Sequence, residues 1–318
     1  MQVISAQEID RLLDYPSLIV ALRDAFGGTM VAPVRHHHEV GSGAGHATHL
    51  IMPAWTGDAP GGGFVGTKIV NVFPANSAKG LPAVYGSYLL QSGETGAPLV
   101  VLDGTRLTHW RTAAASALAA SFLARDDAAH LLVIGAGALA PELIKAHSAV
   151  RPIKAVTLWN HRRESAERLA ASLAGSPYKL AIADDLAAAV AGADIISCAT
   201  LSQQPIVLGQ WLQPGTHVDL VGAFNMAMRE ADDAALLRAK VFVDTPAAKH
   251  EGGDVAVALH AGAVPEAHIR GDLAALCAGK VHGRDDASDI TLFKSVGASI
   301  EDLAAAMLVW RKSQAKAA

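Results

Sequence analysis

Two basic side chains stand in segments that are otherwise apolar. Lys68 interrupts the predicted strand of residues 64–70, and burying an ammonium group there is costly unless an anion pairs with it. Arg111 falls in the first turn of a predicted alanine-rich helix, where a positive charge opposes the helix dipole. Both placements favour a bound anion, and Arg35 is a third candidate for the same role.

Each of the first two cations also has a purely structural interpretation. Lys68 could lie on an edge strand, with its stem on apolar surface and its ammonium group in water. Arg111 could form an ion pair inside the protein with a residue such as Asp103 or Glu94. The residues alone leave these alternatives open.

A glycine-rich turn is the strongest local signal in the chain. The apolar strand predicted at residues 131–134 runs into Gly135-Ala136-Gly137-Ala138-Leu139-Ala140, and a helix is predicted to follow. Gly-x-Gly-x-x-Ala between a strand and a helix is typical of dinucleotide-binding folds, because the first glycine makes a tight turn and the second lets the backbone approach a pyrophosphate. The helix N-terminus then faces the phosphates. We therefore expect Gly135, Ala136, Gly137, Ala138 and Leu139 to bind a dinucleotide.

The end of the next predicted strand bears on which dinucleotide is bound. NAD-specific folds place an acidic residue there, whereas this chain has Asn160, His161 and Arg162. No carboxylate repels a 2′-phosphate, Arg162 can donate hydrogen bonds to it, and Asn160 can bond the ribose. We expect these three residues to contact the cofactor, with NADP(H) preferred and NAD(H) as the alternative. Arg163 is expected on a solvated helix face.

Three further residues follow later strands. Thr200, Leu201 and Val221 come directly after apolar runs. Ligands of open α/β sheets bind at the carboxyl ends of the strands. We therefore expect these residues to line the cofactor as well.

Several other chemistries have no support. His36-His37-His38 invites a metal interpretation, but only two of these side chains share a face of a strand and no acidic residue or cysteine completes a ligand set. The nucleophile elbow of serine hydrolases and the Walker loop are absent. Cys198 and Cys277 are too far apart in sequence for a close-spaced redox pair, so both are expected as buried thiols in a reducing compartment.

Composition places the chain among well-buried globular proteins. Of its 318 residues 51% are apolar and 18% charged, and the net charge is −4. This balance gives no general attraction to nucleic acid or to an anionic membrane. No apolar stretch reaches the roughly 18 residues of a spanning helix, and the charged first residues lack a signal peptide's apolar stretch. We expect a cytoplasmic protein that binds a small molecule.

The order of the elements indicates two kinds of sheet. Residues 30–103 contain short β-like runs between turn residues, typical of a small mixed sheet. After the alanine-rich helix, apolar strands alternate with helices, as in a parallel sheet covered on both faces. The last segment predicts an amphipathic helix from about Ile300. The fold class expected is therefore α/β, a Rossmann-type doubly wound sheet joined to a smaller α+β domain.

A family resemblance rests on motifs that span nearly the whole chain. In chain order they are Pro33-Val34-Arg35, Met52-Pro53-Ala54-Trp55, Thr67-Lys68, Asp103-Gly104, Arg111-Thr112-Ala113-Ala114, the Gly135-Ala136-Gly137 loop and Phe293-Lys294-Ser295-Val296-Gly297 with Glu301-Asp302. Together they resemble the ornithine cyclodeaminase/μ-crystallin family. The resemblance implies a dinucleotide-binding domain at 119–294, and a substrate-binding and dimerisation domain at 1–118 and 295–318. It also implies a homodimer, with Arg35, Lys68 and Arg111 holding the substrate carboxylate.

The resemblance also suggests a subclass. Members that deaminate ornithine or act as alanine dehydrogenases carry an aspartate where this chain has Phe224. The segment is more similar to that of ketimine reductases, which reduce Δ1-pyrroline-2-carboxylate and Δ1-piperideine-2-carboxylate to proline and pipecolate. We expect that activity here. The alternatives are an ornithine cyclodeaminase or amino-acid dehydrogenase, and a non-catalytic NADPH-dependent binding protein of the μ-crystallin type.

Overall fold

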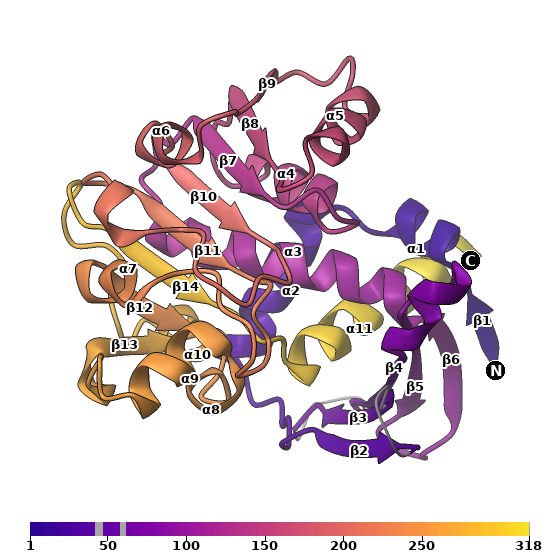
Figure 1. Cartoon of the computed structure of the whole chain (residues 1–318). Coiled ribbons are helices and arrows are strands. Elements are labelled where there is room, and N and C mark those ends of the chain that lie inside the picture. Colours follow the sequence, from indigo (N-terminus) through magenta and orange to yellow (C-terminus); the bar gives the residue numbers. More distant parts are fainter. Residues whose placement is uncertain (42–46, 58–61, 318) are drawn as a thin grey trace. The chain divides into compact units, whose positions relative to one another are not determined.

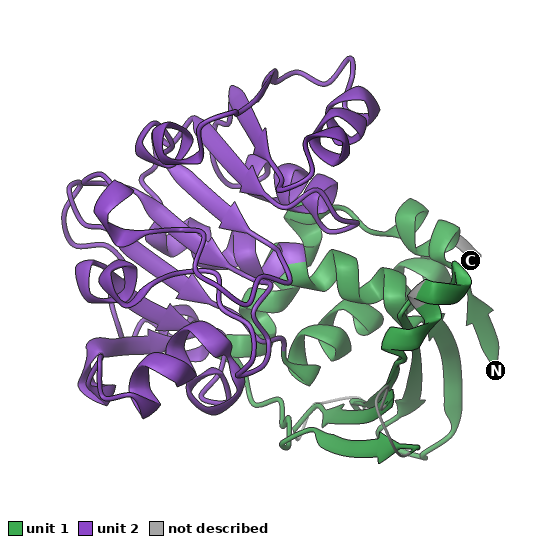
Figure 2. Cartoon of the chain, in the orientation of Figure 1, with its two compact units in different colours: residues 1–112, 298–318 green, residues 113–297 purple. Residues whose placement is uncertain are grey.

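The computed structural model describes residues 1–41, 47–57 and 62–317. The chain forms two compact units (Figure 2): unit 1 comprises residues 1–112 and 298–318, and unit 2 comprises residues 113–297. Helix α3 (Gly104–Leu123) crosses the boundary between them. The sequence placed these boundaries at residues 118/119 and 294/295, and the role expected for each unit stays a prediction.

Unit 1 is built on a mixed sheet with helices on one side (Figure 1). The strand order is β1-β6-β5-β4-β3-β2, in which β1 is parallel to β6 and every other pair is antiparallel. The elements of this unit are β1 (Gln2–Ile4), α1 (Ala6–Leu12), α2 (Tyr15–Gly27), β2 (His36–Val40), β3 (Ala47–Trp55), β4 (Phe64–Val72), the short helix η1 (Pro74–Lys79), β5 (Val84–Ser92), β6 (Pro98–Asp103) and α11 (Ser299–Ala317).

The side chains of this sheet alternate between a covered and an outer face. Lys68 of β4 pairs in register with Met52 of β3 and Tyr88 of β5. Directly opposed residues share a face, and all three side chains are buried. Helix α11 packs on β3, β4 and β5 and its Asp302 contacts Lys68, so this row lies on the face that α11 covers.

Local capping sets where the first helices begin. Ser5 accepts a hydrogen bond from the Glu8 amide, and the Glu8 carboxylate accepts one from the Ser5 amide. Asp14 caps α2 through the Ser17 amide. These caps satisfy amides that have no partner inside a helix. The capping box at Ser5 and Glu8 is readable in the sequence because it depends only on near neighbours.

Unit 2 is a parallel eight-stranded sheet in the order β13-β12-β14-β11-β10-β7-β8-β9. The strand order reverses between β7 and β10, which is the switch point where open α/β sheets bind ligands. Its strands are β7 (His130–Ile134), β8 (Ala155–Trp159), β9 (Lys179–Ile182), β10 (Ile195–Cys198), β11 (His217–Leu220), β12 (Lys240–Val243), β13 (Ile269–Asp272) and β14 (Thr291–Lys294). Its remaining helices are α4 (Ala140–Ser148), α5 (Arg163–Ser172), α6 (Leu186–Ala191), η2 (Gly209–Trp211), α7 (Asp233–Arg238), α8 (Ala248–Glu251), α9 (Gly253–His260), η3 (Glu266–His268) and α10 (Leu273–Cys277).

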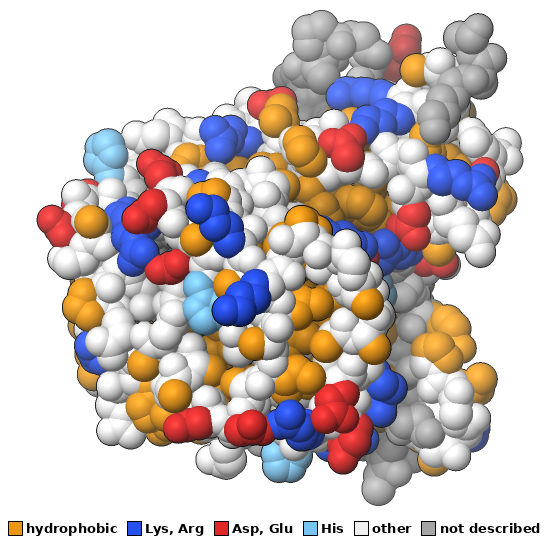
Figure 3. Space-filling model, turned by 90° about the horizontal axis from the view of Figure 1, so that it is seen from above, with side chains coloured by type: hydrophobic (Ala, Val, Ile, Leu, Met, Phe, Trp, Pro, Cys, Tyr) orange, Lys and Arg blue, Asp and Glu red, His pale blue; other side chains and the backbone are white. Residues whose placement is uncertain are grey.

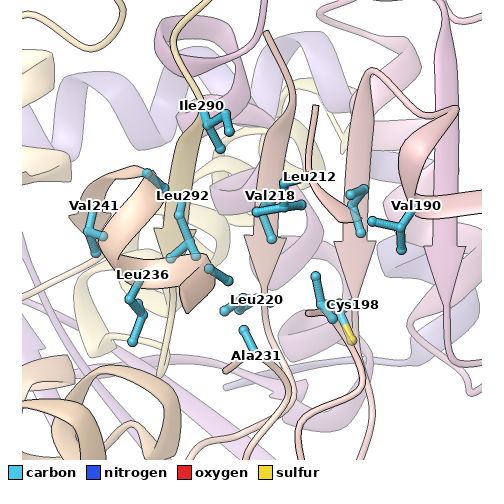
Figure 4. Packing of buried hydrophobic residues seen from close by; sticks show 14 of the residues in the cluster. Val190, Cys198, Leu212, Val218, Leu220, Ala231, Leu236, Val241, Ile290 and Leu292 are labelled. Carbon is cyan, nitrogen blue, oxygen red and sulfur yellow. The ribbon is translucent and has the colours of Figure 1, made fainter. Parts of the chain in front are cut away.

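Both faces of this sheet are buried in apolar cores. Leu131 and Val133 of β7 belong to the core beneath α4 and α5, whereas Leu132 and Ile134 belong to the core on the other face. Figure 4 shows this second core, in which Val218, Leu220 and Leu292 pack between neighbouring strands and helices. Because both faces are covered, residues 131–134 of the central strand β7 are apolar without alternation.

The two cysteines, both predicted to be buried, differ in their exposure. Cys198 is buried, and burial raises the pKa of its thiol well above the usual range, but Cys277 is only half-buried. Among the described residues no helix is long and apolar enough to cross a membrane.

Figure 3 shows basic and acidic side chains interspersed on one face of the molecule.

Candidate functional site

The glycine loop of unit 2 has the conformation that its sequence predicts. Gly135 has φ +104°, and a Cβ there would lie 2.5 Å from the carbonyl oxygen of Ala199. A Cβ on Gly137 would meet no atom within 4 Å, so the loop offers open space beside its backbone. Gly135 is therefore required by the fold, whereas Gly137 leaves room for a ligand.

Asn160 holds this loop in place. Its Oδ1 accepts a hydrogen bond from the Ala136 amide at 3.1 Å, and its Nδ2 donates to the carbonyl oxygen of Arg162 at 2.9 Å. The sequence predicted a bond from Asn160 to a ribose. In the structure this amide joins the end of β8 to the glycine loop.

A hollow of about 530 Å³ opens over these strand ends, a size typical of ligand sites. Its lining residues are Gly135, Ala136, Gly137, Trp159, Asn160, His161, Arg162, Ser165, Ala199, Thr200, Leu201, Ser202 and Ile206. Ala138, Leu139 and Val221, which the sequence also proposed, are not among them. None of these described lining residues is acidic, so this part of the wall carries no charge that would repel a phosphate.

The two arginines after β8 have different surroundings. Arg162 precedes α5, is exposed and lines the hollow. Arg163 lies outside it and pairs with Glu167 and Asp184 on the surface. Only Arg162 is placed to meet a bound anion.

Lys68 and Arg111 of unit 1 share one carboxylate. The Nζ of Lys68 lies 2.7 Å from Asp302 Oδ2, and the Nε of Arg111 lies 3.0 Å from Asp302 Oδ1. Arg111 Nη1 also lies 2.7 Å from Glu301 Oε2. All four side chains are buried. The structure therefore brings Lys68 and Arg111 to one site, as the sequence predicted. The carboxylates of Glu301 and Asp302, from the first turn of α11, lie between them.

The structural alternative for Lys68 is wrong, whereas the one for Arg111 is correct in kind but not in its partners. Lys68 does not reach water from an edge strand, since β4 lies between β3 and β5 and Lys68 is 2% exposed. Arg111 does form an internal ion pair, but with Glu301 and Asp302 rather than with Asp103 or Glu94.

Arg111 does not lie in the first turn of its helix, as the sequence predicted, because α3 begins at Gly104 and Arg111 lies about two turns inside it. The acidic side chains do occupy a favourable position, since Glu301 and Asp302 lie in the first turn of α11.

Burial changes the proton affinity of Lys68. Desolvation, followed by the nearby Arg111 charge, lowers the pKa of Lys68 from 10.5 to about 8, although Asp302 opposes this shift. An amine with such a pKa can hold a proton at neutral pH and release it readily. With two cations and two carboxylates the group is electroneutral, so an additional positive charge is needed to attract an anion.

Arg35 lies where the register of the sheet brings it toward Lys68. It directly precedes β2, whose first residue His36 pairs with Ile51, while the adjacent Met52 pairs with Lys68. Continuing this register puts Arg35 in the same row across the sheet as Lys68. Its side chain is half-buried, and the register makes Arg35 a candidate for the additional charge.

Sequence reasoning gave no role to three buried acidic or phenolic groups. Glu301 and Asp302 appeared there only as part of a motif, although acidic residues at the start of an apolar helix were a usable signal. Tyr88, in the same row as Lys68, is fully buried, and burial followed by the Asp302 charge raises the pKa of its hydroxyl well above the usual range. Nothing local in the sequence marks it.

Comparison with known proteins places this chain in a family. The family model described as "Ornithine cyclodeaminase/mu-crystallin family" matches residues 2–317. The chain belongs to this family. It is 38% identical over 312 residues to a Δ1-pyrroline-2-carboxylate reductase of Paracoccus denitrificans, covering 98% of this chain and 96% of that protein.

Solved structures of the family have the same fold over the whole chain. The Δ1-pyrroline-2-carboxylate reductase of Thermococcus litoralis, in complex with NADH and L-proline, is 32% identical with a TM-score of 0.93, covering 100% of this chain and 98% of that one. An archaeal alanine dehydrogenase dimer with bound NAD is 28% identical with a TM-score of 0.91, covering 100% of this chain and 97% of that one. The expected fold class, α/β with a Rossmann-type sheet, is confirmed.

Proposed function

We propose that this protein uses a nicotinamide dinucleotide to reduce a cyclic α-imino acid, Δ1-pyrroline-2-carboxylate, Δ1-piperideine-2-carboxylate or both, to L-proline or L-pipecolate. The observation that carries the proposal is the pair of buried cations, Lys68 and Arg111, in a chain that matches named imino-acid reductases over nearly its full length. The enzyme is an oxidoreductase that acts on a C=N bond.

Unit 2 fits the cofactor. The positive φ of Gly135, the open space beside Gly137 and the hollow lined by Asn160, His161 and Arg162 match what a dinucleotide needs. Thr200 and Leu201 form another part of the wall. When bound, the reduced dinucleotide supplies the hydride. Because the lining contains Arg162 and no acidic residue, we assign a preference for NADP(H) over NAD(H).

Unit 1 holds the substrate in this proposal. Arg35, Lys68 and Arg111 bind its carboxylate and so fix the position of the imine carbon. Reduction adds the hydride to that carbon and a proton to the ring nitrogen. Solvent can protonate a cyclic imine before it binds, and Lys68 can act as a proton donor because its pKa is near 8. The exposed Phe224 offers no acid at the position where the deaminating relatives carry aspartate.

The protein is proposed to act as a homodimer. The outer face of the unit 1 sheet exposes apolar side chains, including Trp55, Ile69 and Tyr85. By strand register these alternate with the covered row that contains Lys68. A second copy of the chain is the occupant that fits, since the related alanine dehydrogenase is a dimer. The cytoplasmic location expected from the sequence stays a prediction.

One panel of assays tests the reaction. The purified chain is incubated with NADPH and five- or six-membered cyclic imino acids, and NADPH consumption is followed. In parallel, ammonia release from L-ornithine and NAD(P)⁺ reduction with L-alanine are measured. We expect turnover only with the imino acids. Ammonia release without reduction would support a cyclodeaminase, alanine oxidation an amino-acid dehydrogenase, and tight binding without turnover a non-catalytic binding protein.

A further inference from the structure

A buried carboxylate lies behind the wall of the hollow in unit 2. Glu230 is completely buried and follows the loop after β11. Its Oε1 accepts hydrogen bonds from the Thr200 amide at 2.7 Å and the Thr200 hydroxyl at 2.9 Å. Its Oε2 accepts from the amides of Gly222 at 2.7 Å and Ala223 at 3.3 Å. One side chain thus binds the segments that follow two neighbouring strands.

These two segments are in close contact. A Cβ on Gly222 would lie 2.0 Å from the carbonyl oxygen of Thr200 and 2.6 Å from Glu230 Oε1. On its other side the Thr200 segment touches the glycine loop, since a Cβ on Gly135 would strike Ala199. The Thr200 segment, which forms part of the wall of the hollow, therefore packs directly against the glycine loop. Glu230 holds this segment through its hydrogen bonds to Thr200.

Glu230 is itself held by a second buried pair. Asp254 Oδ1 accepts the backbone amides of Glu230 at 2.7 Å and Ala231 at 2.8 Å. Asp254 Oδ2 lies 3.1 Å from the Nζ of Lys294, and both side chains are fully buried. Figure 4 shows Ala231, the neighbour of Glu230, near Cys198 and Leu220 at the strand ends. Lys294 from β14 thereby contributes to fixing the segments after β10 and β11.

We propose that Glu230 is a positioning residue for the dinucleotide, acting through Thr200 and Gly222. This inference rests on the proposed cofactor and extends it to a residue outside the hollow. A carboxylate suits the role because its two oxygens accept all four donors. In either orientation an amide would turn its NH₂ group toward at least one backbone N–H donor, that of Thr200 or those of Gly222 and Ala223, and leave it without an acceptor, which is costly inside a protein.

The main test is the Kd of NADPH for the wild type and for Glu230→Gln, measured by fluorescence on folded protein. We expect affinity to fall about tenfold or more. KM for NADPH should rise, while KM for the imino acid stays unchanged. Asp219→Asn is the matched control, because Asp219 is equally buried on β11 but bonds Ser116, Ser197 and His147. It should lower stability and leave the Kd of NADPH unchanged.

A second variant covers the case in which Glu230→Gln does not fold. Thr200→Val removes the hydroxyl that donates to Glu230 at 2.9 Å and accepts the Ser202 amide at 3.3 Å, and it should also weaken NADPH binding. If both variants fold, their effects should be less than additive in the double variant, since they disrupt one contact. Unchanged NADPH affinity in Glu230→Gln, or in Thr200→Val where only that variant folds, would overturn the inference. So would equal losses in Glu230→Gln and Asp219→Asn. If the wild type binds neither NADPH nor NADH, the proposed function itself fails.

Discussion

The carboxylate of Asp302 lies between two buried cations, Lys68 and Arg111, and this arrangement governs the chemistry of unit 1. Because Asp302 pairs with both cations, their charges can be buried without a large loss of stability. Removing one partner of such a buried ion pair would leave an unpaired buried charge and lower the free energy of unfolding by about 3–5 kcal/mol. Burial, followed by the Arg111 charge, keeps Lys68 close to the point of losing its proton, although Asp302 opposes this shift. The site combines a fixed positive guanidinium with an ammonium whose charge depends on pH.

Binding of a carboxylate should weaken as pH rises through about 8, the pKa of Lys68. A bound anion favours the charged form of Lys68. Above this pKa the affinity for the carboxylate should therefore decrease with pH, and the decrease should approach about tenfold for each pH unit. Over the same range the empty protein should gain stability, since the unfolded lysine still holds its proton. The measurement is the Kd of pyrrole-2-carboxylate, whose ring does not titrate near this pH. Lys68→Met should bind weakly at every pH, and a flat wild-type profile would contradict this role.

Arg162 should determine the preference between the two dinucleotides. Its guanidinium lines the hollow, and a charge-assisted bond to a 2′-phosphate is worth about tenfold or more in affinity. Arg162→Ala should therefore reduce the ratio of NADPH to NADH affinity by about that factor. The control is Arg163→Ala, which removes only surface ion pairs and should leave the ratio unchanged. An unaltered ratio in Arg162→Ala would show that another group selects the cofactor.

The elements of unit 2 bring the ends of β7, β8 and β10 to one edge of the sheet. The glycine loop between β7 and α4 was predictable because its signal lies within ten residues. The pairing of Lys68 with Asp302 was not, since these residues are far apart in sequence and only the packing of α11 on β4 joins them. The bonds from Glu230 to Thr200 and Gly222 likewise depend on how two strand ends align.

The two loop glycines should respond differently to alanine. In Gly135→Ala the new Cβ would strike the Ala199 carbonyl at a positive φ, so both thermal stability and NADPH binding should fall. In Gly137→Ala the Cβ meets open space, so stability should be retained while the methyl group blocks the pyrophosphate and weakens binding. Melting temperature and the Kd of NADPH are measured for both. Equal NADPH affinity in Gly137→Ala and the wild type would argue against phosphate binding at this loop.

At the scale of the whole molecule, the chain folds into two compact units, to which we assign different tasks only as a proposal. Alternating strands and helices after residue 119 predicted the parallel sheet of unit 2, because covered parallel strands are apolar on both faces. That residues 298–318 return to unit 1 came from the family resemblance, since no local pattern reports where a distant helix packs. The outer face of the unit 1 sheet remains apolar and exposed at Ile69 and Tyr85.

Replacing Ile69 by glutamate should dissociate the proposed dimer. Ile69 is 38% exposed on the outer face, so the charge would be solvated in a monomer but buried without a partner in an interface. Sedimentation velocity should show a dimer for the wild type and a monomer for Ile69→Glu, with similar circular dichroism. Val20→Glu, an exposed position on α2, serves as the control. A wild-type monomer would refute the assignment.

The most direct test of the proposed activity is to follow the hydride itself. The protein is incubated with Δ1-pyrroline-2-carboxylate and NADPH that carries deuterium at the transferred C4 position, and the product is analysed by chiral chromatography and mass spectrometry. We predict L-proline with one deuterium on the α-carbon for each NADPH consumed. Absence both of proline and, with Δ1-piperideine-2-carboxylate as the substrate, of pipecolate would contradict the proposed activity, and so would a product without deuterium at the α-carbon.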